Sequence, residues 1–227
     1  MPRSKRYLEL AGKIKADQLY SLEEALKLVK ETSTTKFPGS IELHVRLGIN
    51  KEKSDQQVRS TVTLPHGTGK TAKVAVFAVG PAAQEAKDAG ADLVGGEELI
   101  AEIQKTGKIN FEVAVATPDM MKNLAKIAKI LGPKGLMPSP KNETITNEVK
   151  KAVNELKKGK IAFKNDATGN IHLQIGKADF ADDKLQENIE TVMEAIKKAR
   201  PQGIKGTYIK TVSLNATMGP GVRVSLL

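Results

Sequence analysis

Apolar residues follow two different patterns along the chain, and this contrast constrains the fold more than any other feature of the sequence. The expected strands near both ends alternate between apolar and polar residues, as in 40–49 (SIELHVRLGI) and 57–64 (QVRSTVTL). Between them, 73–79 (KVAVFAV) and 111–117 (FEVAVAT) are almost continuously apolar and are separated by helical segments. Alternation is typical of antiparallel sheets with one solvated face, whereas apolar strands separated by helices are typical of parallel sheets. The sequence therefore predicts an α/β (α+β) fold that contains both kinds of sheet.

The order of these patterns predicts two domains. Because the alternating pattern returns late in the chain, residues 1–66 and 160–227 are expected to form one discontinuous α+β domain. Residues 67–159 are expected to form an inserted α/β domain with a parallel sheet. Two sequential domains are the alternative, and the change of strand pattern at both borders favours the insertion. The residues expected to act as a hinge at the two chain crossings are Gly67, Gly69 and Gly159.

Local signals predict several individual elements. Ser21 and Glu24 have the spacing of a capping box at the start of a helix. The turn residues 167–169 separate two alternating segments and predict a β-hairpin. A single helix is expected over residues 118–131, with apolar residues on one side. Its opposite side would carry the lysines Lys122, Lys126 and Lys129, which suit either a solvated face or a phosphate-contacting surface.

Charge and composition narrow the possible partners. Lysine and arginine number 36 against 26 acidic residues, so the net charge is +10, which favours a polyanionic partner. Scattered lysines are also typical of an ordinary solvated surface. The absence of cysteine excludes disulfides and thiolate sites, and the three histidines lie too far apart to predict a metal site. Because no apolar run is long enough to span a bilayer, we expect a cytoplasmic protein without membrane contacts.

Residues 66–71 (HGTGKT) end like a phosphate-binding loop but lack the rest of its pattern. The first glycine of that motif would fall at position 64, which is leucine, and a strand rather than a helix is expected to follow. A flexible connection is therefore the favoured interpretation. Since no catalytic set or cofactor motif is apparent either, we predict a protein that is not an enzyme and has no cofactor. The alternative hypothesis is a nucleotide-binding enzyme that uses the inserted α/β domain.

The segment 131–141 (LGPKGLMPSPK) concentrates glycine, proline and lysine directly after the expected helix. Gly132 is expected to end that helix in a left-handed conformation, and Gly135 allows a tight backbone. Leu136 and Met137 are expected to pack against the core of the inserted domain. Without an acid, a base or a nucleophile, this segment is predicted to be a stiff basic loop rather than an active site.

Two other loops place an apolar side chain among small polar residues. Phe37 precedes a proline in 35–42 (TKFPGSIE), and Met218 lies between Thr217 and a glycine in 215–222 (NATMGPGV). Neither side chain has the setting of a core residue. Proteins contact RNA in this way, with hydroxyl and backbone groups at phosphate and 2′-OH and an apolar side chain on a sugar or base.

Several longer stretches resemble the L-one family of large-subunit ribosomal proteins in its bacterial form. The most specific are KIAKILGPKGLMPSPKN and the terminal ATMGPGVRV. Others occur in family order along the whole chain: SLEEAL, KFPGSIELHVRLG, RSTVTLPHGTGK and KIAFKNDATGNIHLQIGK. The resemblance implies a discontinuous rRNA-binding domain and an inserted Rossmann-like domain.

It also implies a role in translation. A member of this family is expected to bind large-subunit rRNA in the cytoplasmic ribosome, as part of the mobile stalk near the exit site. There it would assist the release of deacylated tRNA. The free protein is expected to be a monomer and to repress translation of its own operon by binding the mRNA.

The resemblance further implies which residues contact rRNA. The implied residues are Lys36, Phe37, Glu42, Lys164, Asp166, Thr168, Thr211, Thr217, Met218 and Gly219. Among them Glu42 is an acid that faces a polyanion, so it can only accept hydrogen bonds from 2′-OH groups, exocyclic amines or backbone N–H groups. We therefore expect Glu42 to contribute specificity rather than affinity.

Overall fold

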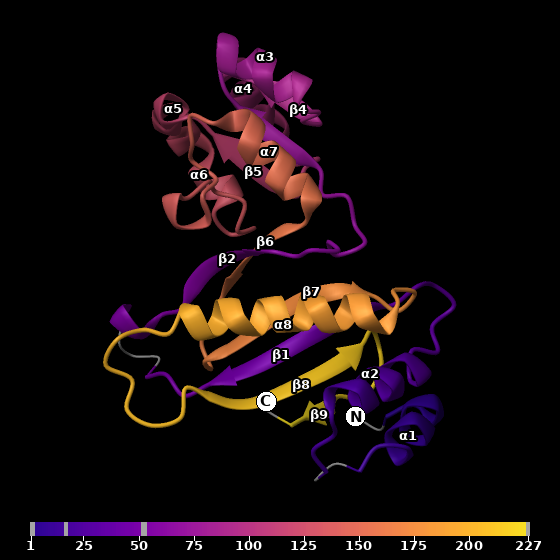
Figure 1. The fold of residues 1–227 in the computed structure, drawn as a ribbon. Helices are drawn as coiled ribbons and strands as arrows, with labels where there is room; N and C mark the ends of the chain where they lie inside the picture. The colour runs from indigo at the N-terminus through magenta and orange to yellow at the C-terminus, as the bar shows by residue number, and fades with distance from the viewer. Residues whose placement is uncertain (1–2, 16–17, 51–53, 226–227) are drawn as a thin grey trace. The chain divides into compact units, whose positions relative to one another are not determined.

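The computed structural model divides the chain into two compact units (Figure 1). The first unit comprises Met1–Gly69 and Ala162–Leu227, and the second comprises Lys70–Ile161. A parallel sheet lies between antiparallel strands in sequence order, which confirms the predicted mixed α/β fold. The described residues are 3–15, 18–50 and 54–225.

The first unit is built on a four-stranded antiparallel sheet with the order β7-β1-β8-β9. Its central strand β1 places every second residue in the core, as its alternating sequence predicts. The residues on this buried face of β1 are Ile41, Leu43, Val45 and Leu47. The bounds of the strands are β1 Ser40–Leu47, β7 Asn170–Lys177, β8 Ile209–Ala216 and β9 Val222–Val224.

Helices cover the apolar face of this sheet. Helix α2 packs against β8 and β9, and α8 packs against β7 and α2 (Figure 1). The predicted capping box of α2 is confirmed, because Glu24 N–H donates to Ser21 Oγ and Ser21 N–H donates to Glu24 Oε2. The helical segments of this unit are α1 Lys5–Gly12, α2 Leu22–Glu31, the 3-10 turn η1 Ser54–Gln56 and α8 Asp182–Lys198.

The predicted hairpin around 167–169 is wrong as a strand pair. Strand β6 (Lys160–Lys164) pairs with β2 (Arg59–Thr63) in a separate two-stranded sheet, whereas β7 pairs with β1. A tight turn does form, since Asp166 N–H donates to the carbonyl of Asn170 (2.8 Å). The strands then diverge because the apolar alternation of β7 matches the buried face of β1.

The second unit contains a parallel three-stranded sheet with the order β4-β3-β5. Every residue of β3 is buried, as expected for a strand with helices on both faces. Helices α3 and α7 pack on one face, and α4 lies with the 118–131 segment on the other. The bounds are β3 Val74–Phe77, α3 Pro81–Asp88, β4 Leu93–Gly95, α4 Glu97–Thr106, β5 Val113–Ala116 and α7 Val149–Lys158.

The single helix predicted over 118–131 is instead broken into four short turns. Leu124 and Ile127 are both fully buried, and 3-10 geometry aligns residues that are three positions apart. The lysines expected on the other side are exposed. The turns are η2 Pro118–Met120, α5 Met121–Leu124, η3 Ala125–Ile127 and α6 Ala128–Leu131.

The left-handed cap predicted at Gly132 is also wrong. Gly132 keeps helical angles (φ −57°, ψ −55°), and the chain turns left-handed only at Gly135 (φ 70°). A side chain at position 132 would lie 2.8 Å from the carbonyl of Ala128, which explains why glycine stands there. The expected packing of Leu136 and Met137 against the core of this unit is confirmed. The segment then enters the 3-10 turn η4 (Pro140–Asn142).

Candidate nucleic-acid interface

The face of the four-stranded sheet that the helices leave open carries polar side chains in cross-strand rows. Strand register sets these rows, and none of their members is buried. Neighbouring rows along β1 are about 7 Å apart, since each strand residue advances about 3.3 Å. The rows are Glu42 between Gln174 and Asn215, His44 between His172 and Ser213, and Arg46 between Asn170 and Thr211.

A chain of side-chain contacts crosses the centre of this open face. Nδ1 of His44 lies 2.7 Å from Nδ1 of His172, and the two rings meet edge to face. Nε2 of His44 lies 2.6 Å from Oδ1 of Asn215. On the other side, Nε2 of His172 lies 3.4 Å from Oδ2 of Asp166. These contacts connect β8, β1, β7 and the turn before β7 into one polar network.

The loops that carry Phe37 and Met218 meet at one end of the sheet. The N–H of Ser40 donates to Oγ1 of Thr217 (2.9 Å), and the N–H of Thr217 donates to the carbonyl of Ser40 (3.0 Å). Phe37 is 50% exposed and Met218 is 62% exposed, which confirms that neither is a core residue. Two apolar side chains therefore stand in solvent beside the polar rows. Lys36 is exposed in the same loop.

Met218 adopts a left-handed backbone conformation (φ 62°), which is unfavourable for a residue with a side chain. Arg6 of α1 supports this position, since Nη2 donates to the carbonyl of Met218 (3.3 Å) and Nη1 donates to Oγ1 of Thr34 (3.3 Å). At the next position, a side chain on Gly219 would lie 3.2 Å from the carbonyl of Ala216. These contacts thus hold the backbone of Met218 in a conformation that leaves its side chain exposed.

The turn before β7 lies at the opposite end of β1. Asp166 accepts hydrogen bonds from the N–H groups of Asn170 (2.7 Å) and Thr168 (2.8 Å) and from the Thr168 hydroxyl. Hydrogen bonds hold the pKa of Asp166 well below its ordinary value, and the N–H of Asn170 makes the largest contribution. Thr168 and His172 also lower this pKa, whereas burial raises it. Asp166 is therefore a carboxylate whose oxygens already have partners within the chain.

The sequence-predicted residues thus fall into three groups. Lys36, Phe37, Thr217, Met218 and Gly219 come together at one end of the sheet, with Glu42 in the adjacent row. Asp166, Thr168 and Thr211 lie towards the other end. Lys164 is exposed on β6, which belongs to the two-stranded sheet.

The sequence interpretation did not identify several polar residues of the open face. His44 and Arg46 alternate with buried residues in β1, so the period-two pattern alone places them on the solvated face. The residues opposite them require the strand register, which the sequence does not give. Arg6 carries no sequence signal for its contact with Met218. The residues that sequence reasoning missed are Arg6, His44, Arg46, Asn170, His172, Gln174, Ser213 and Asn215.

The three glycines expected at the crossings all have left-handed backbones. Gly159 ends α7, and Gly67 and Gly69 follow β2 in the first unit. A side chain on Gly69 would lie 2.7 Å from the side chain of Lys177. Their role as a hinge stays a prediction.

The second unit does not favour the nucleotide-binding hypothesis. Ligands of open parallel sheets bind beyond the carboxyl ends of the strands, where helix N-termini can meet phosphate. Here Glu97 and Glu98 occupy the first turn of α4 directly after β4, and carboxylates would repel a phosphate. Residues 66–71 are followed by β3 rather than by a helix, as expected.

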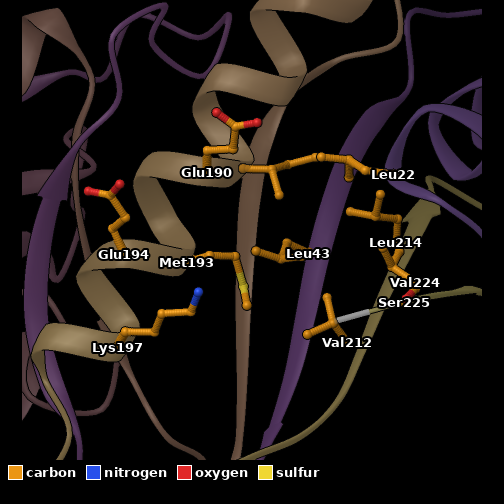
Figure 2. A pocket seen from close by; sticks show the side chains of 11 residues that line it. Leu22, Leu43, Glu190, Met193, Glu194, Lys197, Val212, Leu214, Val224 and Ser225 are labelled. Carbon is orange, nitrogen blue, oxygen red and sulfur yellow. The ribbon is translucent and has the colours of Figure 1, made fainter. Parts of the chain in front are cut away.

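An apolar groove lies on the helix-covered side of the sheet in the first unit (Figure 2). Figure 2 shows Met193 of α8 beside Leu43 of β1 and Val212 of β8. Its volume is about 230 Å³, below the usual range of small-molecule sites, about 300–1,000 Å³. This groove is separate from the polar open face.

Comparison with known proteins identifies the family. The ribosomal protein L1p/L10e family matches residues 29–220. The chain belongs to this family. The large ribosomal subunit protein uL1 of Thermosipho melanesiensis is 51% identical over 226 residues, which cover 99% of this chain and 97% of the relative. The protein of the same name from Rhodococcus erythropolis is 54% identical over 222 residues, covering 98% of this chain and 92% of the relative.

Membership of the L1p/L10e family confirms the resemblance seen in the sequence. It is a family of ribosomal proteins, and this, rather than any absence in the structure, supports the prediction that the chain is not an enzyme. Among the described residues, no helix combines the length and the apolar character needed to cross a bilayer.

Proposed function

We propose that the chain is a component of the large subunit of the cytoplasmic ribosome and binds large-subunit rRNA through the open face of its four-stranded sheet. One observation carries this proposal. The polar rows on β7, β1 and β8 end at two exposed apolar side chains, Phe37 and Met218, which a solvated sheet face alone does not require. The family relationship and the net charge of +10 agree with an RNA partner.

The chemistry of this face suits RNA. Phe37 and Met218 would pack on a base or a sugar, as apolar side chains do in RNA-binding proteins. Hydroxyl, amide and imidazole groups of the rows would bond to 2′-OH groups and base edges. Glu42 would accept hydrogen bonds and so discriminate among base edges, while Lys36 and Arg46 would contact phosphates.

The finer roles rest on the resemblance. We propose that the protein forms part of the mobile stalk near the exit site and assists the release of deacylated tRNA there. A second proposed role is repression of its own operon through an mRNA element with the same contacts. The free protein is proposed to be a monomer.

We also propose that the two units are domains with separate tasks. The first unit would hold the rRNA, because it contains the whole open face. The second unit would be an inserted domain, and Gly67, Gly69 and Gly159 would permit movement where the chain crosses.

A footprint of the protein on rRNA tests the main proposal. The full chain should protect one discrete region of large-subunit rRNA from chemical cleavage. Phe37→Ala should weaken this binding about 5- to 150-fold, the range for a lost stacking contact of about 1–3 kcal/mol. Val79→Ala, which truncates a 58% exposed side chain of the second unit, is the matched control. Dispersed protection, or equal affinities of Phe37→Ala and the native chain, would contradict the proposal.

A further inference from the structure

A basic hollow lies at the end of β1 opposite the Phe37 and Met218 loops. Its volume is about 660 Å³. Cationic side chains line it from three parts of the first unit: Arg46 from β1, Lys210 from β8 and Lys205 from the segment before β8. Among the described residues that line it, none is acidic.

Local backbone geometry directs Lys210 into this hollow. Arg46 pairs with Thr211 while Leu47 pairs with Ile209, so Lys210 is the extra residue of a β-bulge. Bulges change the direction of a side chain relative to the regular strand. The Cε atom of Lys210 lies 3.3 Å from the position that a Cβ atom would occupy on Gly48. The lysine therefore extends over the glycine that follows β1.

Gly48 also fixes the segment that carries Lys205. Its N–H donates to the carbonyl of Tyr208 (2.6 Å). A side chain at Gly48 would lie 2.2 Å from the carbonyl of Thr207, so only glycine allows this close approach. The contact anchors the segment before β8 to the end of β1, on the border of the hollow.

The lining indicates what kind of ligand the hollow takes. Three converging cations repel one another and attract an anion. The carboxylate of Asp166 in the neighbouring turn is bonded to Thr168 and Asn170 rather than directed at these cations. Because no aromatic ring lines the hollow among the described residues, it offers no platform for stacking a base. Phosphate groups are the anions that fit this chemistry.

The hollow is continuous with the open sheet face, and this indicates where its phosphate ligand comes from. Arg46 belongs both to the hollow and to the third polar row, and Thr168 lines the hollow beside the same row. An RNA strand that lies along the face would reach the hollow without leaving the protein surface. We propose that the hollow binds backbone phosphates of the RNA and extends the interface beyond the rows. This inference rests on the proposed rRNA binding.

Salt dependence of RNA affinity provides the test. Each phosphate contact contributes about 0.7–0.9 to the slope of log K against log salt concentration. In the full chain, Lys205→Ala with Lys210→Ala should lower affinity for the large-subunit rRNA stalk fragment about tenfold at moderate salt and reduce the slope by about 1.4–1.8. Lys184→Ala with Lys198→Ala, both exposed on α8, removes the same charge and should leave the slope unchanged.

Other results would overturn the inference. The inference is wrong if the native chain and the Lys205/Lys210 variant have equal salt slopes. It is also wrong if the α8 control loses as much RNA affinity and slope as the Lys205/Lys210 variant. If inorganic phosphate alone shifts the NMR signals of Lys205 and Lys210 while the RNA slope is unaffected, the hollow is a small-anion site instead. Lys205→Ala alone, at an exposed position, keeps the test valid should Lys210→Ala disturb the bulge.

The same experiment separates the two proposals. If the native chain fails to protect a discrete rRNA region, the proposed function fails and this inference fails with it. If Phe37→Ala weakens binding while the Lys205 and Lys210 variants match the native chain in both affinity and slope, only the phosphate site is wrong. Circular dichroism of each variant checks that its fold is intact.

Discussion

The Nδ1 atoms of His44 and His172 lie 2.7 Å apart, on adjacent strands at the centre of the open sheet face. Only one N–H can occupy such a short contact, so one ring donates and the other accepts. Nε2 of His44 faces Oδ1 of Asn215, and Nε2 of His172 faces Oδ2 of Asp166. The two rings therefore form one unit rather than two separate contacts.

This pairing predicts non-additive effects on RNA binding. His44→Ala and His172→Ala should each lower rRNA affinity about fivefold, about 1 kcal/mol, because each leaves the other ring without its partner. The double variant should lose little more than the worse single variant, since residues of one network couple. His66→Ala is the control, because His66 contacts Glu187 on α8 instead. Titration with the rRNA stalk fragment measures all four, and additive losses would contradict the pairing.

The strained backbone of Met218 permits a test that separates RNA binding from stability. Glycine adopts positive φ without the steric cost that methionine bears. Met218→Gly should therefore leave the free energy of unfolding unchanged or raise it by up to about 1 kcal/mol. Its rRNA affinity should nevertheless fall, because the exposed side chain is lost. Urea unfolding and RNA titration give the two values. A less stable variant with native affinity would show that Met218 supports the fold and does not contact RNA.

The hydrogen bonds of Asp166 predict a pH-dependent contribution to stability. In the folded chain, hydrogen bonds from the N–H of Asn170 and from its neighbours hold the pKa of this carboxyl below its ordinary value of 3.8. The stability that these bonds contribute is therefore present above about pH 3.8 and is lost as the pH falls below it. Asp166→Asn should destabilise the chain at pH 7 by about 1 kcal/mol, a modest value since the group is partly exposed. The difference from the native chain should shrink in urea unfolding at pH 2.5. A difference in the free energy of unfolding that is the same at both pH values would contradict the prediction. Asp179→Asn, at an exposed position, is the control.

Tyr208 contains a buried hydroxyl with no hydrogen-bond partner among the described residues. Burial raises the pKa of this phenol to about 12 despite the nearby Arg200. Tyr208→Phe removes an unsatisfied polar atom, so the free energy of unfolding should stay level or rise by about 1 kcal/mol. As the pH rises from about 10 to 12, through the ordinary and then the raised pKa of Tyr208, the native chain should lose stability, and Tyr208→Phe should abolish this loss. Thermal unfolding at pH 7 and pH 11 tests both statements, and a large loss at pH 7 would contradict them.

Short-range patterns explain why much of the fold was predictable. Apolar residues alternate in β1, at Ile41, Leu43 and Val45, and they are continuous in β3. These patterns indicate directly which faces of the strands are buried. The exposure of Phe37 and Met218 followed from their polar surroundings. These features depend on neighbours in the sequence, so the sequence contains them.

Other features depend on residues far away in the chain. The turn at Asp166 looks like a hairpin, but the choice of β1 as the partner of β7 comes from matching apolar faces across more than a hundred residues. The His44–His172 pair and the bulge at Lys210 depend on that register. At Gly132, the close carbonyl of Ala128 decides the conformation, whereas the sequence alone favoured a left-handed cap.

The division into two units predicts that the first unit can fold without the second. Joining Gly69 to Ala162 through a short Gly-Ser linker removes Lys70–Ile161 and keeps the whole four-stranded sheet, α2 and α8. Each unit lies within the usual domain size of about 50–250 residues and has its own buried core. The joined chain should therefore fold and retain rRNA affinity within about tenfold, about 1.4 kcal/mol, of the full chain.

The isolated second unit provides the complementary measurement. Residues 70–161 should fold, because the β4-β3-β5 sheet has helices on both faces, but should bind the stalk fragment weakly and without sequence preference. Circular dichroism and RNA titration of both pieces beside the full chain decide the matter. Tight binding by residues 70–161, with a folded first unit that does not bind, would move the RNA site to the second unit. A first unit that stays unfolded after joining would show that its core needs the insertion, and would refute the discontinuous domain.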